Sequence, residues 1–596
     1  MIHETSGLAR RFLSRLIGRP SRTAWLASAA LGLHAALLAY GAAVHSPGWD
    51  EVGHLPAGIS HWRSGRFDAY RVNPPLVRLV ASLPAVLSGV DIDWTLYSSA
   101  PWQRQEFVLG DELIARLGSE SLWYFRVSRW ACIPFSLLGG LVCFWWSRDR
   151  FGTSAGLGAL ALWCFSPTIV ANAQMITPDT GAAALGVAAC YSFWGWLRDP
   201  SGKGAVAAGC LLGLALLTKF TWVMLPLLWA AIWLIRPPKA LVPGRQRAWG
   251  REALHLGVIF LFALQVVGLG YGFERCFKPL GTIPFTSRTL ADFGAYDPTP
   301  VANRFQGTWL GRLPVPLPAN YLEGIDVQKV DFERGSWSYL GGEWKRGGWW
   351  YYYLYCLLTK EPLGTWALGG LAVGMVFLAR TGNRPGFADI VLLAPPSAVL
   401  ILVSSQTGFN HHLRYVLPAL PFVYIGISRI FVTGGAGPRG RLVRLLAWGL
   451  LAWSVGACLW HTPHHLSYFN ELVGGPRNGP LHLHNSNLDW GQDLLFLKRW
   501  AGDHPEARPL QVVFLSCYSA ESLGIWDDQT FHASDPDACL GREPRLYMKS
   551  PRYYAISVGR MAERIPPNRP DPFSRFRTRV PDDRVGHTFL IYKISD

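Results

Sequence analysis

Long apolar runs almost free of charged side chains recur along this chain and restrict it to a membrane-spanning fold. The first run, from Ala24 to Trp49, contains no Asp, Glu, Lys or Arg. It is long enough to cross a bilayer, which takes about 20 residues. Further runs lie at 130–146, 154–173, 180–197, 204–218, 220–235, 253–272, 363–379, 388–404, 414–431 and 443–461. The sequence therefore predicts an α-helical polytopic membrane protein with about eleven transmembrane helices.

Basic residues indicate how these helices are oriented. Five arginines precede the first run, and Lys or Arg recurs in every second loop, where the loops are short. Cytosolic loops are rich in Lys and Arg, so the N-terminus is expected in the cytosol. The long segments 46–129, 273–362 and 462–596 then lie on the opposite, extracytoplasmic side. The first run is too long for a signal-peptide core, so we expect it to stay as the first helix.

Two domains are expected from this pattern. Residues 1–461 form the transmembrane domain, with 46–129 and 273–362 as its extracytoplasmic loops. Residues 462–596 form a small soluble α/β domain. Its β-rich runs at 510–515, 553–558 and 588–594 predict strands, and 489–501 predicts an amphipathic helix.

Composition excludes several other classes of protein. The net charge of +16 lies mainly in short loops between apolar runs, which favours acidic membrane lipids as its partner and not nucleic acid. No Cys-x-x-Cys pair occurs, so zinc ribbons and thioredoxin chemistry have no support. Cys517 and Cys539 can pair if the C-terminal domain is extracytoplasmic.

Polar residues gather on the predicted extracytoplasmic side. Asp50 and Glu51 directly follow the first run, and acids at a membrane boundary are costly enough to be functional candidates. Lys219, Lys360 and Arg414 lie on the same side, against the bias that keeps basic residues in the cytosol. A single Lys or Arg at a helix end is more often an anchor than a ligand. The placement of all these residues on one side is a stronger argument for a functional site than any single residue.

These residues predict a site for a lipid phosphate and its reaction. Lys219, Lys360 and Arg414, with Tyr415, are expected to bind a phosphate, because Arg offers a bidentate fork and Lys a point charge. Asp50 is expected to act as general base, with Glu51 as its partner or as an acceptor contact. Further candidates for lining the pocket are His54, Asn73, Asp179 and His412. Asp179 can instead cap the helix that follows it.

Histidines cluster at His461, His464, His465, His482 and His484. No carboxylate or cysteine stands near them at a recognisable ligand spacing, so we predict domain contacts and no metal site. The proposed chemistry requires no cofactor. A divalent ion near Asp50 and Asp179 stays an open alternative.

At these residues the chain resembles the GT-C superfamily of membrane glycosyltransferases, in particular the branch of protein O-mannosyltransferases and lipid A aminoarabinose transferases. The matching motifs are Trp49-Asp50-Glu51, Asn73-Pro74-Pro75-Leu76, Thr177-Pro178-Asp179, Gly213-Leu214-Ala215-Leu216-Leu217-Thr218-Lys219, Lys360-Glu361-Pro362-Leu363 and Arg414-Tyr415-Val416-Leu417-Pro418. The resemblance implies a polyprenyl-phosphate sugar as donor, inversion at the anomeric carbon and a base at Asp50. The 462–596 domain departs from the mannosyltransferases' carbohydrate-binding domain, which leaves the acceptor open between protein, lipid and glycan.

The expected function is an inverting glycosyltransferase in the bacterial inner membrane, acting on its outer side. Three alternatives remain from the sequence: a transporter or flippase for polyprenyl-linked substrates, a ligase that moves a whole oligosaccharide, and a non-catalytic sugar-binding membrane scaffold. The adjacent acids Asp50 and Glu51 make the scaffold less attractive. A flippase predicts ionisable residues inside the spans and pseudo-symmetric halves, which the sequence lacks. Pocket size would separate the ligase from a transferase of single sugars.

Overall fold

The computed structural model describes residues 21–97, 104–237, 248–291, 302–378, 386–432, 437–508, 510–514, 516, 518, 521–525, 552–565 and 571–594. The predicted pairing of Cys517 with Cys539 lies outside the described residues.

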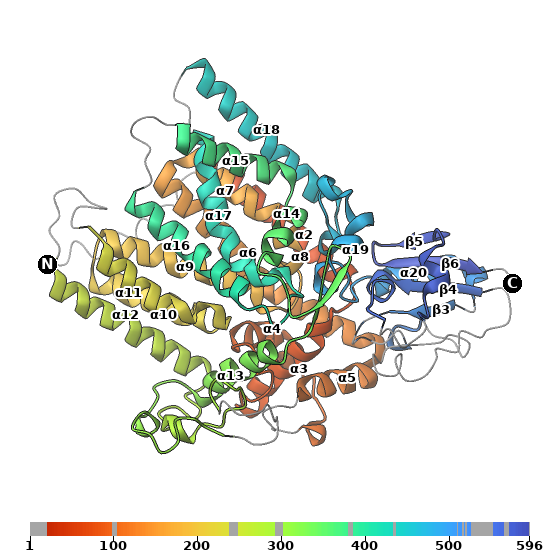
Figure 1. The fold of residues 1–596 in the computed structure, drawn as a ribbon, viewed down its shortest axis with the longest axis horizontal. Coiled ribbons are helices and arrows are strands. Elements are labelled where there is room, and N and C mark those ends of the chain that lie inside the picture. Colours follow the sequence, from red (N-terminus) through yellow and green to blue (C-terminus); the bar gives the residue numbers. More distant parts are fainter. Residues whose placement is uncertain are drawn as a thin grey trace.

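A bundle of helices makes up most of the molecule (Figure 1). Its members are α2 (Arg22–Val44), α6 (Ser121–Phe151), α7 (Thr153–Cys164), α8 (Pro167–Ala173), α9 (Pro178–Arg198), α10 (Gly202–Leu216), α11 (Leu225–Ile235), α12 (Trp249–Gly270), α15 (Leu363–Leu378), α16 (Phe387–Ser405), α17 (Leu420–Ser428) and α18 (Pro438–Trp460). Each of the predicted apolar runs is helical over most of its length. The expectation of a helical polytopic membrane protein is confirmed.

Within the described residues, fewer helices are long and apolar enough to cross a membrane than the predicted number of spans. By length and composition, six helices of the described chain can cross a membrane, or seven if the bent pair α7 and α8 forms one span. The pair bends by 57° between Cys164 and Pro167. Helices α10 and α15 are apolar but shorter than a full crossing, and α11 gains length only from the 3-10 turn Phe220–Met224. Several of the predicted runs therefore form helices that are shorter than a complete crossing or bent within it.

Helix α9 is the most enclosed of these helices. Every residue from Pro178 to Cys190 is buried, and many of them are Ala or Gly. Small residues let neighbouring helices approach closely. A Cβ atom at Gly186 would lie 2.0 Å from the Trp222 indole, so only glycine fits there. This tight packing fixes the N-terminal end of α9, where Asp179 lies.

The two loops between the spans add their own elements at one end of the bundle. The first contributes α3 (Trp49–Ser64), α4 (Leu76–Leu87) and α5 (Gln105–Leu117). The second contributes α13 (Ala319–Arg334), the hairpin of β1 (Trp337–Leu340) and β2 (Glu343–Arg346), and α14 (Tyr352–Lys360). In Figure 1, α3, α4 and α13 lie together below the bundle. The backbone of α13 comes very close to the chain between α3 and α4, because a Cβ atom at Gly324 would lie 2.2 Å from the Arg71 carbonyl oxygen.

The C-terminal region contains a small mixed sheet. Its elements are α19 (Gly479–His482), α20 (Leu494–Asp503), β3 (Leu510–Val513), β4 (Arg552–Ser557), α22 (Val558–Met561), α23 (Ser574–Arg577), β5 (Asp583–Val585) and β6 (Phe589–Ile594). The strand order is β3-β4-β6-β5, with β3 and β4 parallel and the other pairs antiparallel. The three predicted strands are confirmed. Helix α20 begins at Leu494 and not at Asp489, because 489–493 forms a buried loop.

Candidate active site

A cavity of about 150 Å³ opens where the two loops meet the bundle. It is lined by Asp50, Tyr70, Val72, Asn73, Arg104, Pro178, Asp179, Lys219, Gln328, Asp331, Phe409, His412, Arg414 and Tyr415. Seven of the predicted site residues are thereby brought together: Asp50, Asn73, Asp179, Lys219, His412, Arg414 and Tyr415. Glu51, His54 and Lys360 do not line it.

Asp50 and Arg414 face each other across this cavity. Asp50 lies in the first turn of α3, where the helix dipole favours a carboxylate. Arg414 Nη2 donates a hydrogen bond of 2.8 Å to Asp50 Oδ2, and its guanidinium lies 4.2 Å from the Trp490 ring centre. Arg414 Nε and Nη1 are buried and have no hydrogen-bond partner among the described residues. Two nitrogens of this cavity-lining arginine therefore make no hydrogen bond within the described chain.

Lys219 and Asp179 form a second ion pair beside the first. Lys219 Nζ donates to Asp179 Oδ1 at 2.5 Å and lies 4.5 Å from the Tyr415 ring centre. Burial lowers the pKa of Lys219, and the negative charge of Asp179 opposes that shift. Arg414 Nε lies 3.8 Å from Asp179 Oδ2, which links the two pairs. The Asp50 side chain is 21 % exposed and that of Asp179 2 %, so Asp50 is the one an incoming molecule can reach.

Sequence reasoning missed a third group at the rim, formed by Tyr70, Arg104 and Asp331. The Arg104 guanidinium lies 5.0 Å from the Tyr70 ring centre. Burial raises the pKa of Asp331, and the positive charge of Arg104 opposes this. Tyr70 has φ of +55°, a left-handed conformation that costs energy for a non-glycine residue. The i, i+3 spacing of Gln328 and Asp331, which places both on one face of α13, was the available signal.

Glu51 faces away from the cavity. Arg129 forms a bidentate pair of hydrogen bonds with the Glu51 carboxylate, 2.8 Å from Nε to Oε1 and 2.6 Å from Nη2 to Oε2. The backbone N–H groups of Gly48 and Ile176 donate to the same carboxylate. With its side chain fully buried and every oxygen occupied, Glu51 anchors the start of α3. These contacts indicate a structural role in place of the predicted role at the reaction centre.

His54 and Lys360 are also placed outside the cavity. His54 stacks on Tyr70 with ring centres 4.1 Å apart, and burial, reinforced by the charge of Arg78, lowers its pKa well below the usual range. Lys360 Nζ donates to the carbonyl oxygens of Leu466 at 2.7 Å and Asn487 at 2.6 Å. Lys360 therefore ties α14 to the C-terminal segment, and its predicted phosphate contact has no support in this geometry.

The loop 485–493 supports the cavity from the C-terminal side. Asn487 accepts from the Leu413 N–H at 2.7 Å and donates to the His411 carbonyl oxygen at 2.8 Å. Ser486 Oγ contacts His412 Nδ1 at 2.6 Å. Further along, the Trp490 ring packs on Arg414. The C-terminal region therefore fixes the chain directly before Arg414, packs on the Arg414 side chain and is part of the site's construction.

The same loop also fixes the approach to Asp50. Ser46 N–H donates to the Gln492 carbonyl oxygen at 3.0 Å, and Ser46 Oγ donates to that of Gly491 at 2.7 Å. Trp49 N–H reaches the Trp490 carbonyl oxygen at 3.3 Å. One loop thus positions both the carboxylate and the guanidinium of the central ion pair.

Comparison with known proteins gives one sequence match and a weak structural likeness. Residues 112–269 match the family model described as dolichyl-phosphate-mannose-protein mannosyltransferase. The expected resemblance to membrane glycosyltransferases is confirmed over this stretch, which contains Asp179 and Lys219 but not Asp50 or Arg414. No curated protein matches the chain.

Among solved structures, the chain is similar to ArnT from Cupriavidus metallidurans in two states. The structure bound to undecaprenyl phosphate is 13 % identical, with a TM-score of 0.44, and covers 96 % of this chain and 98 % of that chain. The apo structure is 13 % identical, with a TM-score of 0.42 and 98 % coverage of both chains. A likeness this low transfers neither a ligand nor a residue's role to this protein.

Proposed function

We propose that the protein is a membrane glycosyltransferase that moves one sugar from a polyprenyl-phosphate donor to an acceptor hydroxyl or amine, with inversion at the anomeric carbon. The observation that carries the proposal is the meeting, in one cavity, of a partly exposed carboxylate at Asp50 with the buried cations Arg414 and Lys219. The donor class is taken from the family match over residues 112–269.

In the proposed reaction the acceptor attacks the anomeric carbon while the bond from that carbon to the phosphate oxygen breaks. The acceptor's proton passes to Asp50, the only carboxylate of the two buried ion pairs with appreciable exposure. The bonding electrons leave with the phosphate, which gains negative charge. Arg414 Nε and Nη1 supply unused donors for that charge, and Lys219 supplies a second cation.

The balance of charge in the cavity suggests how the donor binds. Arg104, Lys219 and Arg414 face Asp50, Asp179 and Asp331, so the site is close to neutral before a ligand enters. An entering phosphate competes with Asp50 for Arg414. Loosening that ion pair releases the Asp50 carboxylate toward the acceptor, so donor binding itself prepares the base.

The size of the cavity favours a single sugar over an oligosaccharide. Pockets for drug-sized ligands hold about 300–1,000 Å³. A cavity of about 150 Å³ accommodates a phosphate and part of one sugar. We therefore place the transferase ahead of the oligosaccharide ligase.

A donor panel tests the proposal. Purified protein is incubated with polyprenyl phosphates carrying single hexoses, pentoses or aminopentoses, together with a panel of protein, lipid and glycan acceptors, and released polyprenyl phosphate is measured. We expect release with at least one donor, loss of release in Asp50→Asn, and wild-type release in the control Asp503→Asn, an exposed acid at the end of α20. Donor binding without release in the wild type contradicts a transferase and favours the flippase.

We further propose that the cavity opens on the extracytoplasmic side of the bacterial inner membrane, with the N-terminus in the cytosol. The predicted basic loops and the gathering of the long segments around one cavity support this orientation. A cysteine introduced at the exposed position Asp503 should react with a membrane-impermeant thiol reagent in intact spheroplasts. Labelling only after the membrane is broken contradicts the orientation.

A further inference from the structure

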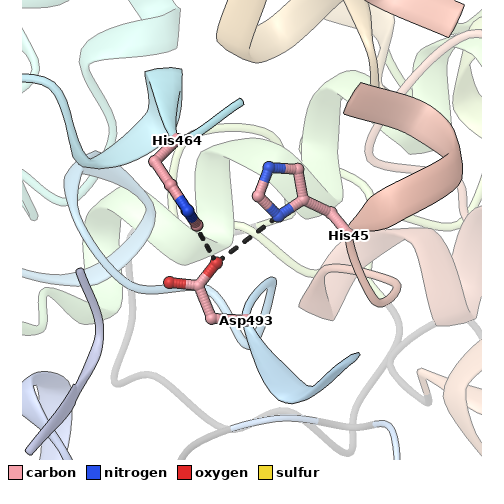
Figure 2. Close-up of side chains that lie close together, drawn as sticks. All are labelled: His45, His464 and Asp493. Carbon is pink, nitrogen blue, oxygen red and sulfur yellow. Dashed lines mark ion pairs between the residues drawn. The ribbon is translucent and has the colours of Figure 1, made fainter. Parts of the chain in front are cut away.

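Outside the cavity, His45, His464 and Asp493 converge from three distant parts of the sequence (Figure 2). His45 directly follows α2, His464 follows α18, and Asp493 directly precedes α20. Figure 2 shows both imidazoles directed at the same carboxylate oxygen. Asp493 Oδ1 lies 3.4 Å from His45 Nδ1 and 3.3 Å from His464 Nδ1.

These distances fit a bridging metal better than direct hydrogen bonds. Charge-assisted N–H···O bonds are about 2.7–2.9 Å long. Two ligands of a tetrahedral zinc with bonds of about 2.0–2.1 Å lie about 3.3–3.4 Å apart. Both measured separations have that length. The three donor atoms all lie within 4.8 Å of one another. The two histidine nitrogens therefore need to approach each other by at most about 1.5 Å to reach the separation found in a tetrahedral zinc site.

The buried polar atoms of the cluster also lack other partners. Asp493 is fully buried, and its Oδ1 has no hydrogen-bond partner among the described residues. The same holds for His464 Nδ1. Leaving such atoms unpaired in a protein interior costs about 1–3 kcal/mol each. A cation between them removes that cost.

A surrounding shell of hydrogen bonds already orients two of the three side chains. Asp493 Oδ2 accepts from His587 N–H at 3.1 Å and from Thr588 Oγ1 at 3.0 Å, which turns Oδ1 toward the imidazoles. His45 Nε2 lies 3.0 Å from the Pro463 carbonyl oxygen. Donation of the second ring N–H to a carbonyl is the usual support of a metal-bound histidine.

We propose that His45, His464 and Asp493 bind one zinc ion that fixes the C-terminal region to the first extracytoplasmic loop. Two imidazoles and a carboxylate match the ligands that zinc accepts, and a water or the nearby His587 imidazole completes the four. The role is structural: His45 stands five residues before Asp50 and beside the loop 485–493, whose Trp490 packs on Arg414. This proposal departs from the prediction from sequence that the C-terminal histidines hold no metal.

The competing account is an ion pair without metal. His45 Nδ1 also lies 3.2 Å from the Gln492 carbonyl oxygen, and a ring that donates from both nitrogens is an imidazolium facing Asp493. In a zinc site Nδ1 is instead unprotonated and bound to the ion. The two accounts differ in whether the purified protein contains a metal.

Metal content decides between them, with full-length protein expressed without a histidine tag, purified in detergent and dialysed against metal-free buffer. Plasma mass spectrometry should find about one zinc per chain, because a site with three protein ligands releases its ion slowly. Removal with a strong chelator should lower the thermal midpoint, and added Zn²⁺ should restore it. Wild-type protein with less than about a tenth of an equivalent of transition metal overturns the proposal.

A matched pair of variants locates the ion. His464→Gln should lose at least about nine-tenths of the zinc. His461→Gln should retain it, because His461 lies three residues earlier and bonds the Ala457 carbonyl oxygen. Zinc retained equally in both variants places it elsewhere and refutes the site. None of these measurements depends on glycosyl transfer, so their failure leaves the proposed enzymatic function standing.

Discussion

Two neighbouring carboxylates with opposite surroundings offer the sharpest test of the site. Glu51 is fully buried and accepts hydrogen bonds from Arg129 and from two backbone N–H groups. Asp50 is partly exposed and pairs with Arg414 in the cavity. Glu51→Gln should therefore destabilise the fold, and Asp50→Asn should remove activity.

The loss of stability expected for Glu51→Gln follows from the contacts that remain in the variant. Removing one partner of a buried ion pair costs about 3–5 kcal/mol. Arg129 keeps bonds to the carbonyl oxygens of Ala42, His45 and Ser46, and Gln can still accept from one backbone N–H. We therefore expect Glu51→Gln to lower the free energy of unfolding by about 3 kcal/mol, the low end of that range.

The second variant should change stability little. Asn at position 50 keeps an oxygen that accepts from Arg414, and Arg414 keeps its contact with Asp179, so we expect the free energy of unfolding to fall by only about 1 kcal/mol. It loses the proton acceptor, however, and a general base contributes about 10²- to 10⁴-fold to the rate. Its donor turnover should fall by that factor.

Both variants are measured by thermal unfolding in detergent and by release of polyprenyl phosphate, normalised to folded protein. The expected pattern is a stable, inactive Asp50→Asn and an unstable Glu51→Gln that keeps wild-type turnover per folded molecule. A Glu51→Gln protein as stable as wild type but inactive would refute the assignment of the two acids.

Three further predictions follow from the described contacts. Arg414→Gln should weaken polyprenyl-phosphate binding about 10- to 100-fold, because a hydrogen bond to a charged group contributes about 1.5–3 kcal/mol, and Arg414→Lys should recover part of it; equal affinities in a lipid-binding titration contradict the phosphate role. Lys360→Met should lower the thermal midpoint by leaving two buried carbonyl oxygens unpaired, with the donor KM unchanged; a raised KM at unchanged stability would return Lys360 to the phosphate site. Burial lowers the pKa of His61 to about 3. Its contribution to stability is therefore complete above the unfolded pKa of about 6.5 and is lost as the pH falls, by about 2 kcal/mol at pH 5. The thermal midpoint of His61→Gln should fall less than that of wild type between pH 7 and pH 5, and identical pH profiles contradict this.

The helical class and most of the cavity were predictable from the sequence, because both depend on the order of apolar runs. Asp50, Lys219 and Arg414 each stand at the end of such a run, and alternation of the runs assigned them to one side. Their meeting in one cavity agrees with that assignment. Which side of the membrane the cavity faces stays a prediction from the positions of the basic loops.

The orientation of a side chain about its helix was not predictable in the same way. Asp50 and Glu51 are adjacent, but successive residues of a helix point about 100° apart. One therefore faces the cavity and the other faces Arg129. Lys360 likewise points toward Asn487 and not toward Lys219.

Contacts between distant segments were the other limit. His45 and Asp493 are separated by most of the chain, and neither carries a local metal-binding motif. Four residues of the first loop and α13 also line the cavity and come together only in the fold: Tyr70, Arg104, Gln328 and Asp331. Such sites depend on tertiary structure that spacing alone does not encode.

The most direct test of the central claim is a structure of the full-length protein with polyprenyl phosphate bound. The account predicts the phosphate within hydrogen-bond distance of Arg414 Nε or Nη1, close to Lys219, with the Asp50 carboxylate turned toward the remaining space. A phosphate held elsewhere on the protein, with the Asp50–Arg414 and Lys219–Asp179 pairs unchanged, would contradict it.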